Sequence, residues 1–183
     1  MKKFVNGCLV IACVLGSVSS GLAQGRGAPA CTTLSCDILG DWERTRTLVV
    51  GLADAMPDDK FTFKSTPAQR SYAEQVMHIV QTDVMLLGSI GAKTPAPMVN
   101  LKATSKPEVM AALRQSYDFG TAVIKEFNDQ QLNERVKSLP FLGPTTTRIR
   151  VIYGSMQHSN DIYGQMVVYV RLNGITPPAS NRP

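Results

Sequence analysis

The chain has 183 residues and a formal net charge of +5, with charged residues making up 18% of its composition. This mild charge, without a basic cluster, excludes a nucleic-acid-binding surface. Once a leader is set aside, about 160 residues remain, which is enough for one domain that buries its own core.

Residues 1–23 are predicted to be a secretory signal peptide. Two lysines precede the uncharged apolar run 4–18, and small residues lead to a cleavage site after Ala23. Cleavage removes two lysines and no acid, which lowers the formal charge from +5 to +3. We therefore expect export to the periplasm or the medium, with no membrane insertion of the mature chain. Two alternatives stay open: retention of the run as an anchor, although about 20 residues usually span a membrane, and lipid attachment at Cys13.

The N-terminal segment 24–36 contains the two cysteines that remain after cleavage. Cys31 and Cys36 are an even pair in an oxidising compartment, so a disulfide closing a small loop before the first helix is predicted. Two unpaired thiols are the alternative. A metal site is less favoured here, because no third soft ligand lies nearby in the sequence.

Four amphipathic helices are predicted between residues 37 and 178, because apolar side chains recur at steps of three and four. The second helix is expected to start with a capping box in which Thr66 is the N-cap, Pro67 follows, and Gln69 is the third residue. Ser105 and Glu108 predict the same motif for the third helix. The four helices cover about residues 37–55, 66–90, 105–127 and 146–172.

The connection between the second and third helices, residues 91–104, is long for antiparallel neighbours. It predicts a crossover, or a loop that covers one end of the bundle. Gly174 is placed to end the last helix in a left-handed conformation, and residues 179–183 form a polar tail. The economical fold is an all-α four-helix bundle.

The chain has only two histidines, His78 and His158, and both fall in the middle of predicted helices. Each lies on a stripe that mixes polar and apolar residues, which is typical of a pocket lining rather than a sealed core. Two imidazoles alone are too few for a closed zinc site with four ligands or an open one with three. The neighbours predicted on these stripes are Glu74 and Thr82 beside His78, and Ile162, Gln165 and Tyr169 beside His158.

Two segments carry a family resemblance. The run HSNDIYGQ at 158–165 and its continuation to Pro178 resemble the last helix of the DinB/YfiT-like family, which carries H-x-x-x-H-x-G-Q. The run SYAEQVMH at 71–78 resembles the segment with that family's first histidine. The resemblance covers about residues 37–178. It implies a four-helix bundle with a divalent metal, zinc or nickel, held by one histidine from the second helix and two from the fourth.

Carried over position by position, the resemblance assigns two metal ligands, His78 and His158. The third family position falls on Ile162, which cannot bind a metal. Glu74 is the better of two carboxylates that could complete a His-His-carboxylate set, because it lies about 40° from His78 around the helix. Asp161 lies about 60° from His158. A hydrogen-bonded or solvated carboxylate is the alternative for Glu74.

The sequence and the family resemblance are compatible with three functions. The first is an exported DinB-like bundle with an incomplete metal site, which binds a small-molecule ligand or is weakly catalytic. The alternative, implied by the wider superfamily, is a metal-dependent transferase- or hydrolase-type enzyme that uses His78, His158 and a carboxylate. Haem held between facing helices is the third. Whether the protein is an enzyme stays open, and so does a homodimer paired through helix faces, as family bundles form.

Overall fold

The computed structural model describes residues 30–137 and 139–181. The predicted signal peptide, with Cys13, lies outside the described residues, and so does the end of the polar tail. Within the described part there are five α-helices, three short 3₁₀ helices and one two-stranded sheet. Their bounds are α1 Leu34–Ala55, η1 Asp58–Lys60, α2 Tyr72–Gly88, α3 Lys106–Lys125, α4 Asp129–Asn133, β1 Arg135–Lys137, η2 Pro140–Leu142, β2 Thr145–Thr147, α5 Arg148–Leu172 and η3 Pro178–Asn181.

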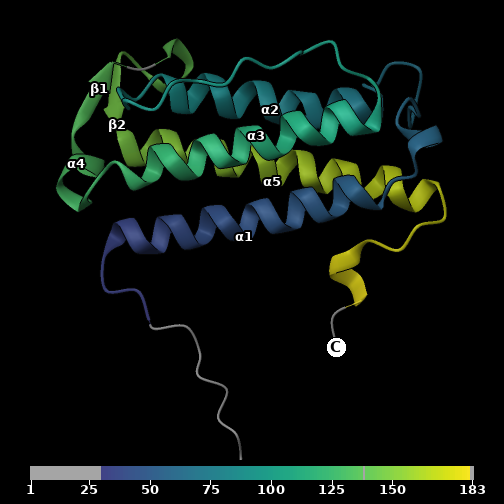
Figure 1. Ribbon diagram of the computed structural model, residues 1–183, viewed down its shortest axis with the longest axis horizontal. Coiled ribbons are helices and arrows are strands. Elements are labelled where there is room, and N and C mark those ends of the chain that lie inside the picture. Colours follow the sequence, from purple (N-terminus) through teal and green to yellow (C-terminus); the bar gives the residue numbers. More distant parts are fainter. Residues whose placement is uncertain (1–29, 138, 182–183) are drawn as a thin grey trace, which may run out of the picture. The chain divides into compact units, whose positions relative to one another are not determined.

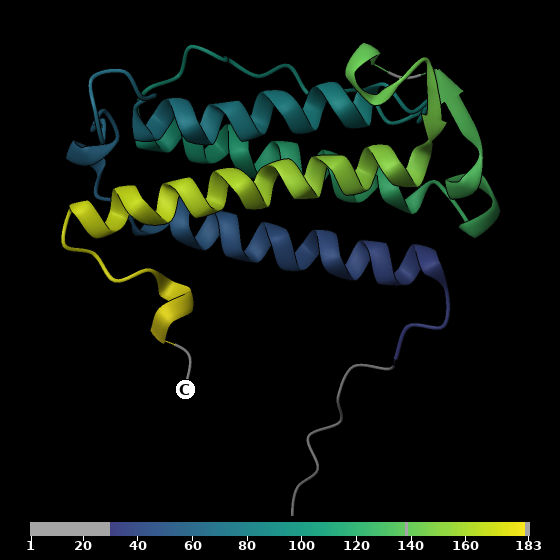
Figure 2. The same cartoon turned by 180° about the vertical axis from the view of Figure 1, so that it is seen from behind.

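The four long helices form the predicted all-α bundle. Helices α1 and α2 each pack against both α3 and α5. Helices α2 and α3 run in the same direction, and the chain between them returns along the bundle (Figures 1 and 2). The long connection is therefore a crossover, because parallel neighbours require a loop as long as the bundle. None of the helices in the described part is both long enough and apolar enough to cross a membrane.

The core lies between the inward faces of the four long helices. Trp42 is fully buried, and its ring nitrogen donates a hydrogen bond to the backbone oxygen of Tyr117 at 3.1 Å. The Trp42 ring lies directly over Gly120, where a Cβ atom would approach it to 2.0 Å. Close contact between α1 and α3 therefore requires glycine at position 120.

The start of α2 differs from the prediction. The capping box expected over residues 66–69 is wrong, because α2 begins at Tyr72 with Ser71 as its N-cap. The Ser71 hydroxyl accepts the backbone N–H of Glu74 at 3.2 Å, and the Glu74 carboxylate accepts the backbone N–H of Ser71 at 2.6 Å. The Tyr72 N–H donates to the backbone oxygen of Phe63 at 2.9 Å. This pairing with the preceding loop, which local sequence cannot reveal, sets the later start.

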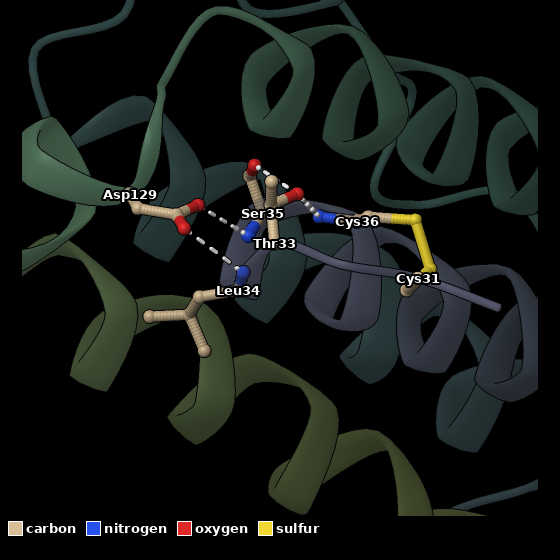
Figure 3. The surroundings of a disulfide bond; sticks show 6 residues. All are labelled: Cys31, Thr33, Leu34, Ser35, Cys36 and Asp129. Atoms are coloured by element: carbon tan, nitrogen blue, oxygen red, sulfur yellow. Dashed lines mark hydrogen bonds between the residues drawn. A yellow bond between two sulfur atoms is a disulfide. The ribbon is translucent and has the colours of Figure 1, made fainter.

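Helix α1 begins at Leu34, earlier than predicted, so that its first turn includes Cys36. Cys36 forms the predicted disulfide with Cys31, and their Cα atoms are 5.5 Å apart. The Asp129 carboxylate accepts the backbone N–H groups of Leu34 at 3.1 Å and Ser35 at 2.8 Å (Figure 3). A carboxylate from a distant part of the chain thus caps the helix, which explains the extra turn.

The segment between α3 and α5 is more ordered than predicted. Directly after the predicted third helix, residues 129–133 form the short helix α4, which Asn128 caps. Strands β1 and β2 then pair antiparallel. Arg148 fastens this hairpin to the bundle, because its guanidinium donates to the backbone oxygen of Ile90 at 2.9 Å and to the Glu134 carboxylate at 2.7 Å. Gly174 ends α5 with a φ of 73°, as predicted.

Candidate functional site: a histidine pair beside a polar cleft

Helices α2 and α5 bring the two histidines together. The Nε2 atoms of His78 and His158 lie 3.1 Å apart, and the ring centroids are 4.7 Å apart at an interplanar angle of 67°. Both side chains are half-buried. Residues 80 positions apart in the sequence therefore form one pair, in the interface between antiparallel helices.

The surroundings of His158 indicate which ring donates the hydrogen bond. Its Nδ1 atom is buried and has no hydrogen-bond partner in the described part of the chain. A buried N–H without an acceptor is rarer than an acceptor without a donor. The proton of His158 is therefore best placed on Nε2, from which it donates to Nε2 of His78. The Nδ1 atom of His78 is the nitrogen that remains for a ligand.

The electrostatic environment favours the neutral form of both rings, because it lowers the pKa of each. Burial lowers the pKa of His78, and the charges of Arg70 and His158 lower it further. Burial also lowers the pKa of His158; Asp161 raises it, and Arg70 lowers it. Neutral imidazoles can each donate one hydrogen bond and accept another.

A polar cleft of about 420 Å³ opens beside His78. Two cations, Lys64 and Arg70, and one carboxylate, Glu74, lie in its wall. Lys64 is 3.9 Å from Glu74, whereas no ion pair within the described residues involves Arg70. The cleft therefore carries a positive charge that its own carboxylate does not neutralise. Its other lining residues are Ala68, Gln69, Met77, His78, Gln81 and Leu101.

Two of the predicted pocket residues on α5, Gln165 and Tyr169, belong to a second hydrogen-bonded group. Gln75, which sequence reasoning missed, donates to the side-chain oxygen of Gln165 at 3.0 Å, and the Tyr169 hydroxyl donates to the backbone oxygen of Arg70 at 2.7 Å. Gln165 and Tyr169 line a separate cleft of about 230 Å³. Thr82 is buried. The helical spacing of Gln75 places it on the inward face, but nothing in the sequence distinguished it from a packing residue.

The sequence profile of the DinB superfamily matches residues 41–166, more than half of the chain. The chain belongs to the DinB superfamily. A curated relative, the uncharacterised protein YjoA of Bacillus subtilis strain 168, is 21% identical over 131 residues, which are 72% of this chain and 85% of YjoA.

Two solved structures share the DinB-like fold. A DinB-like protein from Bacillus cereus ATCC 10987 has a TM-score of 0.67 and 20% identity, over 77% of this chain and 93% of that protein. The structure of YjoA from Bacillus subtilis has a TM-score of 0.63 and 19% identity, over 76% of this chain and 94% of that protein. At these identities the likeness concerns the fold.

The side chains present do not fit the three-histidine centre that the DinB resemblance implies. The third position is Ile162, which is apolar and only 3% exposed. Glu74 is held in the α2 cap, where the backbone N–H of Ser71 is the main cause of its lowered pKa. No group of three or more His, Cys, Asp or Glu side chains in the described ranges could hold a metal ion.

The unpartnered Nδ1 atom of His158 is a second reason why the side chains do not fit a metal centre. A histidine that binds metal through Nε2 carries its proton on Nδ1 and usually donates it to a carboxylate or carbonyl. His158 has no such acceptor in the described structure. The Nε2 spacing of 3.1 Å is compatible with one shared ion, but in this DinB bundle it is better explained by a direct hydrogen bond between neutral rings.

Proposed function

We propose that this DinB-superfamily chain is an exported protein that binds a small organic acid in the cleft beside His78. The observation that carries the proposal is the hydrogen-bonded pair of His78 and His158 at the edge of a cleft that also contains Arg70. The Arg70 guanidinium can form charge-assisted hydrogen bonds with a carboxylate. The paired imidazoles supply a fixed hydrogen-bonding group for the rest of the ligand.

Export is supported by the leader pattern of residues 1–23, and a disulfide between Cys31 and Cys36 suits an oxidising compartment. Ligand binding is favoured over metal catalysis because only two imidazoles converge, and the position one turn beyond His158 is the apolar Ile162. We therefore assign hydrogen bonding, rather than metal coordination, to the histidine pair.

Nuclear magnetic resonance of the two imidazoles tests this proposal directly, because an untagged mature protein contains only His78 and His158. Acetate, citrate, benzoate and inorganic phosphate serve as probes. We expect at least one organic acid to shift the His78 resonances, with binding roughly tenfold weaker or worse after Arg70→Gln, since a charged hydrogen bond contributes about 1.5–3 kcal/mol. Arg44→Gln, on an exposed part of α1, is the matched control.

Three results would overturn the proposal. The first is that no probe shifts either imidazole, and the second is that Arg70→Gln and Arg44→Gln bind the acids equally. The third is tight zinc binding by the wild type that is lost in both His78→Ala and His158→Ala, which would restore the metal-dependent alternative.

A further inference from the structure

A carboxylic acid that makes no hydrogen bond to the histidine pair is buried in the bundle core. Asp83 lies on α2 and has no exposed surface. Its Oδ1 atom accepts hydrogen bonds from the hydroxyls of two α5 residues, Ser155 at 2.5 Å and Ser159 at 3.2 Å. Its Oδ2 atom is also buried and has no hydrogen-bond partner in the described part of the chain.

No ion pair among the described residues involves Asp83. Helix α5 contributes the two serine hydroxyls, and α3 contributes Tyr117, whose buried hydroxyl has no partner among the described residues. Tyr117 in turn contacts Trp42 of α1, with ring centroids 5.1 Å apart. The cation Arg46 acts on Tyr117, and it is itself paired with Asp118 at 2.5 Å.

We propose that the Asp83 carboxyl makes the packing of α2 against α5 sensitive to pH. The neutral acid stabilises the folded core, and ionisation of the acid destabilises it. An ionised carboxylate needs donors on both oxygens or a nearby cation, and this one has two donors, both on Oδ1. The neutral acid carries no charge and needs fewer donors; its one buried O–H, on Oδ2, has no acceptor in the described part of the chain, which costs less than an unpaired buried charge.

The electrostatics support this inference. Burial raises the pKa of Asp83 from its usual 3.8 to about 7, against the opposing effect of the two serine hydroxyls. Because the pKa is raised in the folded state, the associated stability is fully present below pH 3.8 and is lost as the pH rises through about 7. Between pH 5 and pH 8 the ratio of folded to unfolded protein should fall roughly a hundredfold through this group.

Urea denaturation of the mature protein between pH 5 and pH 8 measures the effect. Asp83→Asn keeps the shape of the side chain but cannot ionise. The ratio of folded to unfolded protein in this variant, divided by the same ratio in wild type, should therefore rise roughly a hundredfold from pH 5 to pH 8. The control Asp41→Asn changes an exposed carboxyl on α1 and should run parallel to wild type. The comparison cancels the opposite contribution of His78 and His158, whose lowered pKa values remove stability as the pH falls.

Two measurements on the wild type keep the test decisive if Asp83→Asn does not fold. With ¹³C-labelled aspartate, one carboxyl resonance should titrate near pH 7. The fluorescence of Trp42, the only tryptophan, should change over the same range because its ring lies beside Tyr117. Parallel stability curves for Asp83→Asn and wild type, or the absence of a carboxyl that titrates near neutrality, would overturn the inference.

Discussion

Replacing Ile162 by histidine should turn the histidine pair into a three-nitrogen metal site. Position 162 follows His158 by one turn of α5, so the two side chains project from the same face of the helix. The Nε2 atoms of His78 and His158 are already 3.1 Å apart, a separation available to two ligands that each lie about 2.0–2.1 Å from one zinc ion. A third imidazole and a water would complete an open tetrahedral site.

The stability of Ile162→His should depend strongly on metal. Because Ile162 is 3% exposed, losing its buried side chain costs about 1.5–3 kcal/mol, and the new imidazole is left without a designed partner. Zinc at a free concentration a hundredfold above its dissociation constant stabilises the folded state by about 2.7 kcal/mol. The loaded variant should therefore approach wild-type stability, with a rise in Tm of roughly 5–10 °C on adding metal.

Calorimetric titration with zinc and nickel, on untagged protein, decides the outcome. Ile162→Asn introduces a polar side chain without a strong metal ligand and controls for lost packing. Adding His78→Ala to Ile162→His should abolish the new site. Weak and equal binding by wild type and Ile162→His would refute the assignment of position 162. Tight and equal binding would mean that another group, most plausibly Glu74, already completes the site, which Glu74→Gln would reveal.

Three further predictions concern the fold. Gly120→Ala should destabilise the bundle by about 1–3 kcal/mol in thermal unfolding, because the new Cβ would meet the Trp42 ring at 2.0 Å; Gly164→Ala, which meets nothing within 4 Å on α5, should instead stabilise it by about 0.8–1 kcal/mol. Replacing Cys31 and Cys36 by serine should lower stability modestly, by about 2 kcal/mol or less, because the closed loop is short. Two free thiols in protein purified from its native host, found by non-reducing peptide mapping, would contradict the disulfide.

The bundle could be predicted from the sequence because each helix is marked by a local pattern, in which apolar residues recur at steps of three and four. Trp42, Val49 and Leu52 recur at steps of three and four residues or their sum, which predicts one face of the first helix, and all three are buried. Helix starts were harder because their backbone N–H groups are satisfied by distant partners. Asp129 caps α1, and the loop before α2 delays its start to Tyr72. Neither contact leaves a signal in the neighbouring sequence.

The site was partly accessible from the sequence. The two histidines stood out because they are the only ones, and the family motif placed Ile162 at the vacant position. The cleft could not be foreseen, because Arg70 reaches it only once the loop before α2 has folded. Asp83 carried a signal that the sequence reasoning missed: it is the only acidic or basic (Asp, Glu, Lys or Arg) residue between positions 75 and 90.

The claim that the histidine pair is not a metal centre is tested most directly by elemental analysis of the purified, untagged protein. The hydrogen-bonded neutral pair predicts well under one equivalent of zinc, nickel or other transition metal per chain after gel filtration in metal-free buffer. One equivalent per chain that is lost in both His78→Ala and His158→Ala would contradict this account.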